Sequence, residues 1–384
     1  MGKSVGLDIY PRGIRAVEVS GRGAKFKIIR YAHLEVEARG GALDPEAKRH
    51  ALVDLFKRGF SKNHVIAAVD AHDAIVREIP VPFKSDDQIK KVVKFEAEHH
   101  LHDCDADDVI VQYTKIGESA DGTNLLVFAV RKDDLSRRIE ALRGAGVEPL
   151  AVDLDANAYY HAVRASGLLD ESPDCVLLHI GHRATDIIFV MDGKVRGMRA
   201  VRIGVDSIAS GLARDMDIDI READRKMAEI EGDDGQDLFV PAIEGIDIKP
   251  ETEKSHAELE RDIFEQKRDE FLARLKREFV RSAAALRGGE TPDRIIAAGP
   301  GTAVSNLLEL LGQRIGQPVE PFQPSAQFNY RPKNSSAPEF DAGASVAIGL
   351  ALKGIGADAI GMDFRQEELK VANKFELLKN TLAV

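Results

Sequence analysis

The sequence predicts an α/β protein of two related halves, with a smaller βα unit inserted in the first half. Residues 5–9 alternate apolar and polar side chains, a turn follows at 10–13, and the alternation resumes over 14–19, which is typical of a β-hairpin. The same pattern returns at 176–190, with several apolar positions and one arginine recurring at a constant offset. Unrelated hairpins would share the alternation, but the coincident positions favour two related halves.

The remaining elements of the first half follow in order. A third strand is expected at 25–36, which completes a first half of the core over residues 1–63. We expect the inserted unit at 64–148. Its predicted elements are strands at 65–69, 74–79, 110–116 and 124–130, a helix from the capping-box sequence Ser85–Gln88 to about residue 100, and a helix at 133–144 that a glycine ends.

The second half is expected over 149–230 and 271–360, interrupted by a strongly acidic insertion at 231–270 that grades into an amphipathic helix. Its predicted strands are 176–180, 187–190, 194–201 and 294–298, and its predicted helices are 207–214, 222–230, 302–312 and 344–352. Residues 361–384 form a separate tail, extended at first and then basic and helix-prone.

Composition excludes several classes of protein. The chain has 384 residues, 44% of them hydrophobic, which is enough for a real core. Its net charge of −11 argues against nucleic-acid binding. Two cysteines cannot build a disulfide framework, and no apolar run approaches the roughly 20 residues that cross a bilayer. These features predict a soluble, cytoplasmic chain.

Five short motifs, in order, resemble the pilus assembly protein PilM family. They are the opening strand 5–9 with 17–19, the segment 74–82, Phe95–Ala97, Val152–Ala156 and 347–352. The resemblance spans roughly residues 4 to 355. It implies an actin-like two-lobed fold with an FtsA-like inserted βα subdomain. It also implies a scaffold at the inner face of the inner membrane that holds the N-terminal segment of PilN. The related secretion protein GspL recruits a motor ATPase, so a type II secretion platform is an alternative setting.

The tail suggests how partners are held. Residues 362–369 resemble a short segment of PilN and the linker of GspL, so Asp363, Phe364, Arg365 and Leu369 are candidate partner-binding residues. Phe364 would be the apolar anchor in a groove of a neighbouring molecule, which would give self-association. The expected partners are a PilN-like or GspM-like membrane component and the motor ATPase. Membrane association would come through the partner or through a transmembrane helix missing after residue 384.

The resemblance also implies a nucleotide site at Asp8, His179, Gly181, Gly204, Gly299, Gly301 and Thr302. Its first turn departs from the family pattern, because Pro11 has no N–H to donate and Tyr10 would crowd the phosphates. His179 stands where a second acidic residue would help to hold Mg²⁺. We therefore expect a degenerate site, no enzymatic activity and no cofactor. The alternative is an actin-like switch in which ATP with Mg controls partner binding.

One further cluster is considered for metal binding. Acidic, histidine and cysteine side chains crowd residues 96–105, and Glu96 shares a helix face with His99 or His100. No second ligand pair is evident elsewhere in the sequence. A polar helix end that runs into a solvated loop is the favoured interpretation, and no metal site is predicted.

Overall fold

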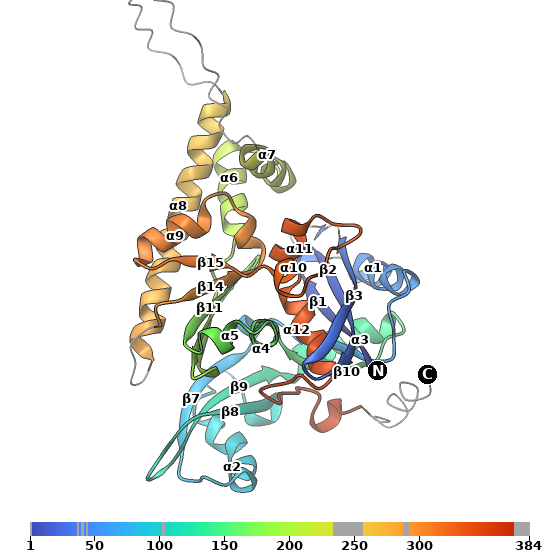
Figure 1. Ribbon diagram of the computed structural model, residues 1–384, viewed down its shortest axis with the longest axis vertical. Helices are drawn as coiled ribbons and strands as arrows, with labels where there is room; N and C mark the ends of the chain where they lie inside the picture. The colour runs from blue at the N-terminus through green and yellow to red at the C-terminus, as the bar shows by residue number, and fades with distance from the viewer. Residues whose placement is uncertain are drawn as a thin grey trace, which may run out of the picture.

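The computed structural model describes residues 2–36, 38–39, 42–43, 45–101, 104–232, 256–286 and 292–371. Two five-stranded sheets form two lobes, and a three-stranded sheet forms a smaller unit at one end of the molecule (Figure 1). None of the helices in these ranges is long and apolar enough to cross a bilayer.

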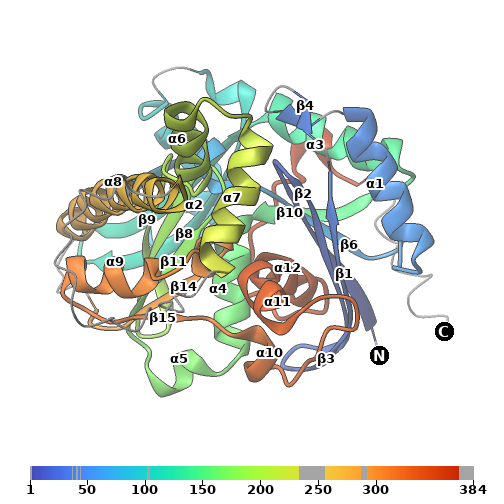
Figure 2. The same cartoon turned by 90° about the horizontal axis from the view of Figure 1, so that it is seen from above.

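The first lobe is built on a sheet with the strand order β10-β6-β1-β2-β3. Its strands are β1 (Gly2–Tyr10), β2 (Gly13–Arg22), β3 (Lys25–Glu35), β6 (Val65–Val69) and β10 (Pro149–Leu154), and a short pair, β4 (Ala38–Arg39) and β5 (Ala42–Leu43), follows β3. Its helices are α1 (Pro45–Lys57), α3 (Lys132–Gly144), α4 (Asp155–Ala165) and α12 (Ser345–Gly354). Seen from above, α4 and α12 run between the two large sheets (Figure 2).

The second lobe repeats this design with the strand order β13-β12-β11-β14-β15. Its strands are β11 (Cys175–Ile180), β12 (Thr185–Met191), β13 (Lys194–Val201), β14 (Ile295–Ala298) and β15 (Val319–Pro321). Its main helices are α6 (Asp206–Met216), α7 (Ile220–Gly232), α8 (His256–Ala285) and α9 (Leu307–Ile315). In both lobes the first two strands form a hairpin. A third strand pairs antiparallel with the second strand of this hairpin, and a later strand pairs parallel with its first strand. The two five-stranded sheets therefore have equivalent strand orders.

The inserted unit contains β7 (Ile75–Val81), α2 (Asp86–Glu98), β8 (Val109–Ser119) and β9 (Gly122–Arg131), with the sheet order β7-β9-β8. It has apolar clusters of its own, in which Ile89 and Val93 of α2 pack against Leu125 and Val127 of β9. The remaining short helices are η1 (Ala71–Asp73), η2 (Ala106–Asp108), α5 (Leu168–Glu171), η3 (Pro300–Ala303), α10 (Pro324–Gln327), α11 (Ala337–Gly343) and η4 (Glu367–Leu369).

Four predicted memberships are wrong. Helix α3 was expected in the insert, but it packs on α1, and its buried side chains belong to the main core of the first lobe. Strand β6 was expected to open the insert but pairs with β1 and β10 in the first sheet. Strand β10 and helix α12 were assigned to the second half, yet β10 forms the edge of the first sheet and α12 packs on β1. Small residues on α12 allow this helix to pack closely in the first lobe. A Cβ at Gly349 would lie only 1.7 Å from the carbonyl oxygen of Ala158 on α4.

Smaller differences concern helix ends. Ser85 precedes α2 as predicted, but its side chain makes no capping hydrogen bond. The helix expected at 302–312 begins only at Leu307, because Asn306 has a left-handed backbone with φ of 55°. Of the predicted acidic insertion, residues 256–270 belong to α8, and residues 233–255 lie outside the described residues, as does the tail beyond 371.

Candidate functional site

The tips of the two hairpins meet between the lobes. The ring of Tyr10 stacks on the ring of His182, with centroids 4.9 Å apart and planes 5° from parallel. The guanidinium carbon of Arg15 lies 4.1 Å from the centre of the Tyr10 ring. The Tyr10 hydroxyl is hydrogen-bonded to His33, which in turn contacts Glu339 at 2.9 Å. Tyr10 is thereby held in place, and it occupies the space between the two turns.

Arg12 ties the first hairpin to the second lobe. Its guanidinium lies 2.8 Å from Asp206 of α6 and 2.7 Å from Asp224 of α7. Asp206 also contacts Nδ1 of His182 at 3.1 Å. Burial lowers the pKa of His182, and the hydrogen bond that Asp206 accepts from its ring opposes that shift. Arg12 therefore forms salt bridges that join the first hairpin to α6 and α7.

An acidic cluster lies beneath the hairpin tips. Asp155 accepts hydrogen bonds from the backbone N–H groups of Ala71 and Ala156, each at 2.7 Å. His179 Nδ1 lies 3.3 Å from Asp186. One ligand atom from each of Asp155, His179 and Asp186 lies within 4.8 Å of the other two. The sequence missed this cluster because its members lie on three separate elements.

The charge of this cluster is poorly compensated. Burial raises the pKa of Asp8, although Arg15 at 3.7 Å opposes the shift. Burial, together with the nearby charges of Asp186 and Asp70, raises the pKa of Asp155 well above its usual range. Desolvated carboxylates that repel one another favour a bound proton or a cation.

The glycine turns predicted for nucleotide binding are packed against protein. The N–H of Gly181 donates to the carbonyl of Ala184 at 2.9 Å, within its own turn. Gly299 has a φ of 95°, and a Cβ there would lie 2.5 Å from the Ile180 carbonyl oxygen. Gly301 is buried against Ile180 and Gly204 against the backbone of His182, while the Thr302 hydroxyl donates to the Gly299 carbonyl at 2.9 Å.

These residues enclose a small cavity. The cavity has a volume of about 40 Å³, and it is lined by Asp8, Tyr10, Asp155, His179, Gly181 and Pro300. Such a volume holds a few water molecules. The residues of the cleft in this conformation therefore do not fit a nucleotide, because the side chains at the hairpin tips occupy the space between the lobes.

A second site lies where the C-terminal segment returns to the molecule. Phe364 is fully buried and belongs to the main apolar core. Its N–H donates to the carbonyl of Val152 on β10 at 2.8 Å, and the N–H of Val152 donates to the Asp363 carboxylate at 3.2 Å. The segment thus runs beside the edge strand β10. We call the residues of β8, β10, α2 and α3 that contact residues 361–369 the tail site.

Charged side chains hold this segment at its rim. Lys132 of α3 lies 2.7 Å from Glu367 and 2.9 Å from Glu368, and Lys94 of α2 lies 2.8 Å from Glu367. Partial burial alone would raise the pKa of Glu367, but hydrogen bonds from Lys132 and Lys94 bring it below its usual range. Arg365 donates to the carbonyls of Leu369 and Pro149 and pairs with Glu148.

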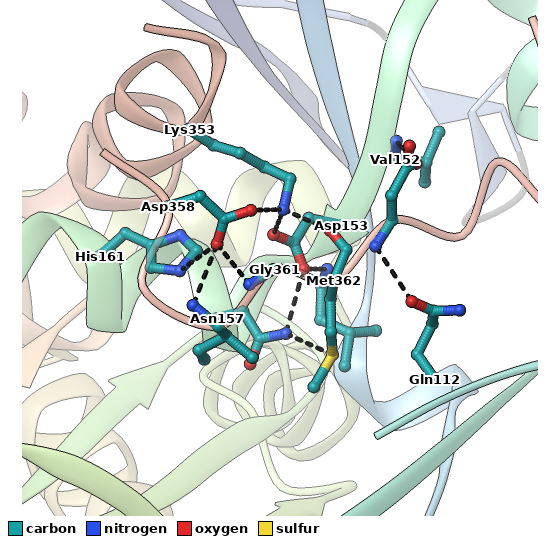
Figure 3. Close-up of polar contacts among 12 residues, drawn as sticks. Gln112, Val152, Asp153, Asn157, His161, Lys353, Asp358, Gly361 and Met362 are labelled. Atoms are coloured by element: carbon teal, nitrogen blue, oxygen red, sulfur yellow. Dashed lines mark hydrogen bonds and ion pairs between the residues drawn. The ribbon is translucent and has the colours of Figure 1, made fainter. Parts of the chain in front are cut away.

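A buried cluster of polar side chains holds the residues that lead into the segment 361–369 (Figure 3). The Lys353 ammonium lies 2.8 Å from Asp153 and 2.6 Å from Asp358, and it donates to the carbonyl of Met362. Burial would raise the pKa of Asp358, but His161 and Lys353 hold it well below its usual range. Asp358 in turn accepts the N–H of Gly361 at 2.8 Å. This buried network fixes where the segment leaves the core.

The predicted site residues therefore divide into two groups. Around the cleft lie the residues predicted for nucleotide binding: Asp8, His179, Gly181, Gly204, Gly299, Gly301 and Thr302. At the tail site lie those predicted for partner binding: Asp363, Phe364, Arg365 and Leu369. The tail residues contact their own chain here, and their binding to a neighbour or partner stays a prediction. The candidate metal residues near 96–105 do not form a ligand group within the described ranges, whereas Asp70, His72 and Asp73 do.

Comparisons with known proteins agree with this architecture. The family model for type IV pilus assembly protein PilM matches residues 6–241. Among solved structures, the PilM–PilN type IV pilus biogenesis complex is 21% identical, covers 92% of this chain and 98% of that chain, and has a TM-score of 0.73. This likeness confirms the predicted actin-like fold. No curated protein sequence matches the chain.

Two other solved structures match the chain with lower TM-scores. Ethanolamine utilization protein EutJ from Carboxydothermus hydrogenoformans is 13% identical, covers 92% of this chain and 90% of that chain, and has a TM-score of 0.48. The cytoplasmic domain of EpsL, an inner membrane component of the type II secretion system of Vibrio cholerae, is 13% identical. It covers 54% of this chain and 75% of that chain, with a TM-score of 0.38.

Proposed function

This chain belongs to the type IV pilus assembly protein PilM family, and we propose that it acts as a non-catalytic scaffold whose tail site holds an extended peptide segment. The observation that carries the proposal is the seating of residues 361–369. The segment supplies one buried aromatic anchor, Phe364, and a main-chain hydrogen bond to Val152 on the edge strand β10. An aromatic anchor together with main-chain pairing at a sheet edge is the usual means of recognising an extended peptide.

The proposed partner is a PilN-like membrane component. The similar solved structure is a complex of PilM with PilN, which supports a partner of that kind. In this chain residues 361–369 take the position proposed for such a segment, so a partner's segment would compete with them. A second contact, with the motor ATPase, would make the chain a link between the membrane components and the motor. The same role in a type II secretion platform, as in GspL, is the alternative setting.

The cleft supports a role without catalysis. Tyr10 and His182 stack across it, and Arg12 bridges to Asp206 and Asp224, so the closed arrangement is held by the protein's own side chains. A nucleotide would have to displace these contacts before its phosphates could approach the turns. We propose that the closed cleft keeps the lobes in one fixed arrangement for partner binding.

Replacing the anchor tests the scaffold proposal. We expect Phe364→Ala to release residues 361–371 and to free the tail site, because the segment loses its buried side chain. Hydrogen exchange should then rise in that segment while the rest of the chain keeps its protection. A fluorescent peptide of residues 361–371 should bind the variant at least about tenfold more tightly than the parent chain, as should the N-terminal peptide of a PilN protein.

Two further variants make this test decisive. Phe95→Ala removes a phenylalanine that is 63% exposed on α2 and should leave peptide binding unchanged. The pair Glu367→Lys and Glu368→Lys breaks the contacts to Lys94 and Lys132 without opening a core cavity, so it releases the segment even if Phe364→Ala unfolds the chain. If neither peptide binds a released tail site, the scaffold proposal is wrong.

A second candidate function is the Mg²⁺–ATP switch, which one observation favours. Asp186 is almost fully buried, and one of its carboxylate oxygens has no hydrogen-bond partner, while Asp8 and Asp155 lie close by without full compensation. Such a cluster would accept a divalent cation. Isothermal titration with Mg²⁺–ATP separates the two functions. Heat that EDTA abolishes and that Asp8→Ala removes would establish the switch, whereas the scaffold predicts no heat from folded protein.

A further inference from the structure

A hollow lined by arginines lies on the second lobe, away from both sites described above. Five arginines, Arg199, Arg202, Arg274, Arg277 and Arg281, surround it together with one acidic residue, Glu278, and its volume is about 470 Å³. Arg199 and Arg202 come from the end of β13 and the residues after it, and the other three come from α8. The chain carries a net charge of −11, so this local excess of positive charge stands out from its surroundings.

Most guanidinium groups that line this hollow are exposed and available to bind an anionic ligand. Arg281 contacts Glu278 at 2.7 Å and its side chain is still 69% exposed, and Arg202 donates to the carbonyl of His72 at 3.3 Å. Arg199, Arg274 and Arg277 are exposed, and none of them forms an ion pair with another residue of the described ranges. On α8, Arg277 follows Arg274 by three residues and precedes Arg281 by four, and like charges at these spacings destabilise a helix.

A second hollow of about 400 Å³, with a smaller polar share of its lining, lies next to the first. Arg199 lines both, and along α8 the second hollow is reached at Ser282, Ala285 and Leu286. Its lining includes the apolar side chains of Val76, Leu126, Phe189 and Met198, and also the charged residues Arg77 and Glu78 of β7. The helix rises about 1.5 Å per residue, so the joint groove from Arg274 to Leu286 is about 18 Å long. An extended chain of about five or six residues has this length.

Strand β13 forms the edge of the second sheet along this groove, and β7 forms the edge of the insert sheet. The two edge strands come close to each other, and residues of both line the second hollow. An extended peptide in the groove would therefore meet guanidinium groups at one end, apolar side chains at the other, and the edge of a sheet beside it.

We propose that this groove, from Arg274 to Leu286 of α8, binds an extended acidic segment of another protein, with its carboxylates on the arginines and an apolar side chain in the second hollow. Arginine is suited to this role because its planar guanidinium pairs with a carboxylate through two parallel hydrogen bonds. A flat lipid surface would not enter a concave site between a helix and a sheet edge, and the acidic chain as a whole would repel a nucleic acid. The proposal does not depend on the proposed function, since it uses neither the cleft nor the tail site.

Binding of a defined peptide tests the proposal. The probe is a fluorescent hexapeptide of sequence Asp-Glu-Asp-Glu-Ala-Leu, with Asn-Gln-Asn-Gln-Ala-Leu as its uncharged counterpart, measured by anisotropy with the full chain at low salt. We expect the acidic peptide to bind at least about tenfold more tightly than its counterpart, and Arg274→Gln with Arg277→Gln to remove about tenfold of that affinity. Both positions are exposed on α8, so the variant should fold normally.

A matched control removes the same charge elsewhere. Lys276→Gln with Lys25→Gln takes away two positive charges from exposed positions that do not line the hollow, one of them on the same helix, and should change affinity by less than about twofold. Equal binding of the two peptides, or equal losses in the two variants, would overturn the proposal. So would inorganic phosphate displacing the peptide at equimolar concentration, or arginine-dependent binding to phosphatidylglycerol vesicles without binding to the peptide.

Discussion

Gly349 lies where helices α12 and α4 approach each other closely. It lies on α12, and a Cβ there would be 1.7 Å from the carbonyl oxygen of Ala158 on α4. No side-chain rearrangement relieves that contact, because the opposing atom belongs to the backbone. The two helices lie between the two large sheets (Figure 2), so a single methyl group would act on both lobes.

We predict that Gly349→Ala lowers the free energy of unfolding by about 3 kcal/mol, the upper part of the usual range for overpacking. Gly144→Ala is the matched control. That glycine ends α3, and the nearest atom to its Cβ would be 3.9 Å away on the flexible side chain of Arg49, so we expect no loss of stability. Chemical denaturation of the two variants measures both values. Equal stabilities would contradict the close approach of α4 and α12.

Other single residues could be interpreted only in part from the sequence. The expectation that Tyr10 and Pro11 disturb the first turn rests on their own chemistry, and Tyr10 indeed fills the space between the hairpins. Asp155 and Asp186 were not identified as site residues, because they meet only when α4 and β12 are brought together. Proximity of this kind leaves no local pattern in the sequence.

At the scale of elements, the segment 361–369 is fixed by carboxylates whose pKa values are depressed. Hydrogen bonds from Lys132 and Lys94 lower the pKa of Glu367, and those from Arg143 and Arg365 lower the pKa of Glu148. A depressed carboxylate pKa stabilises the folded arrangement above the unfolded pKa, and this stabilisation is lost as pH falls through the folded pKa.

We therefore predict that the segment is held at neutral pH and becomes detached in acid, once the pH has fallen below the ordinary range of a glutamate carboxyl group and these carboxylates take up protons. Hydrogen exchange of residues 361–369 against pH, corrected for intrinsic rates, would show the transition. Glu367→Gln with Glu368→Gln should weaken the attachment at pH 7 and make it less dependent on pH. A segment that stays protected to pH 3 would show that Phe364 alone holds it.

Elements also differ in how well the sequence places them. The hairpins β1–β2 and β11–β12 were predicted, because alternation and turn residues are local signals. The neighbours of β6, β10 and α12 were predicted wrongly, because pairing across the sheet depends on residues far away in the chain.

At the scale of the whole molecule, the two lobes are joined at the hairpin tips by Arg12, Tyr10 and their partners. The Arg12 side chain is about one third exposed, so its two ion pairs are partly screened by solvent. We predict that Arg12→Ala destabilises the closed arrangement by about 1 kcal/mol and raises hydrogen exchange in both turns, at residues 10–13 and 181–184.

Arg58→Ala is the comparison for that variant, because it removes an ion pair with Asp54 that lies within one helix and its end. It should leave exchange in the two turns unchanged. If Arg12→Ala and Arg58→Ala behave alike, the lobes are held together by their apolar contacts and not by the salt bridges of Arg12.

The sequence by itself determined the strand pattern of the two halves, the turn chemistry at Tyr10 and Pro11, and the extended character of residues 361–366, since each follows from neighbouring residues. The expected extended conformation does not reach residue 369, because residues 367–369 form the short helix η4. Only the tertiary structure decided that α12 returns to the first lobe, that Asp155, His179 and Asp186 form one cluster, and that Phe364 is buried in its own chain. The physical reason is the same in each case. Local conformation depends on residues a few positions apart, whereas burial and charge pairing depend on which surfaces remain to be covered once the elements have formed.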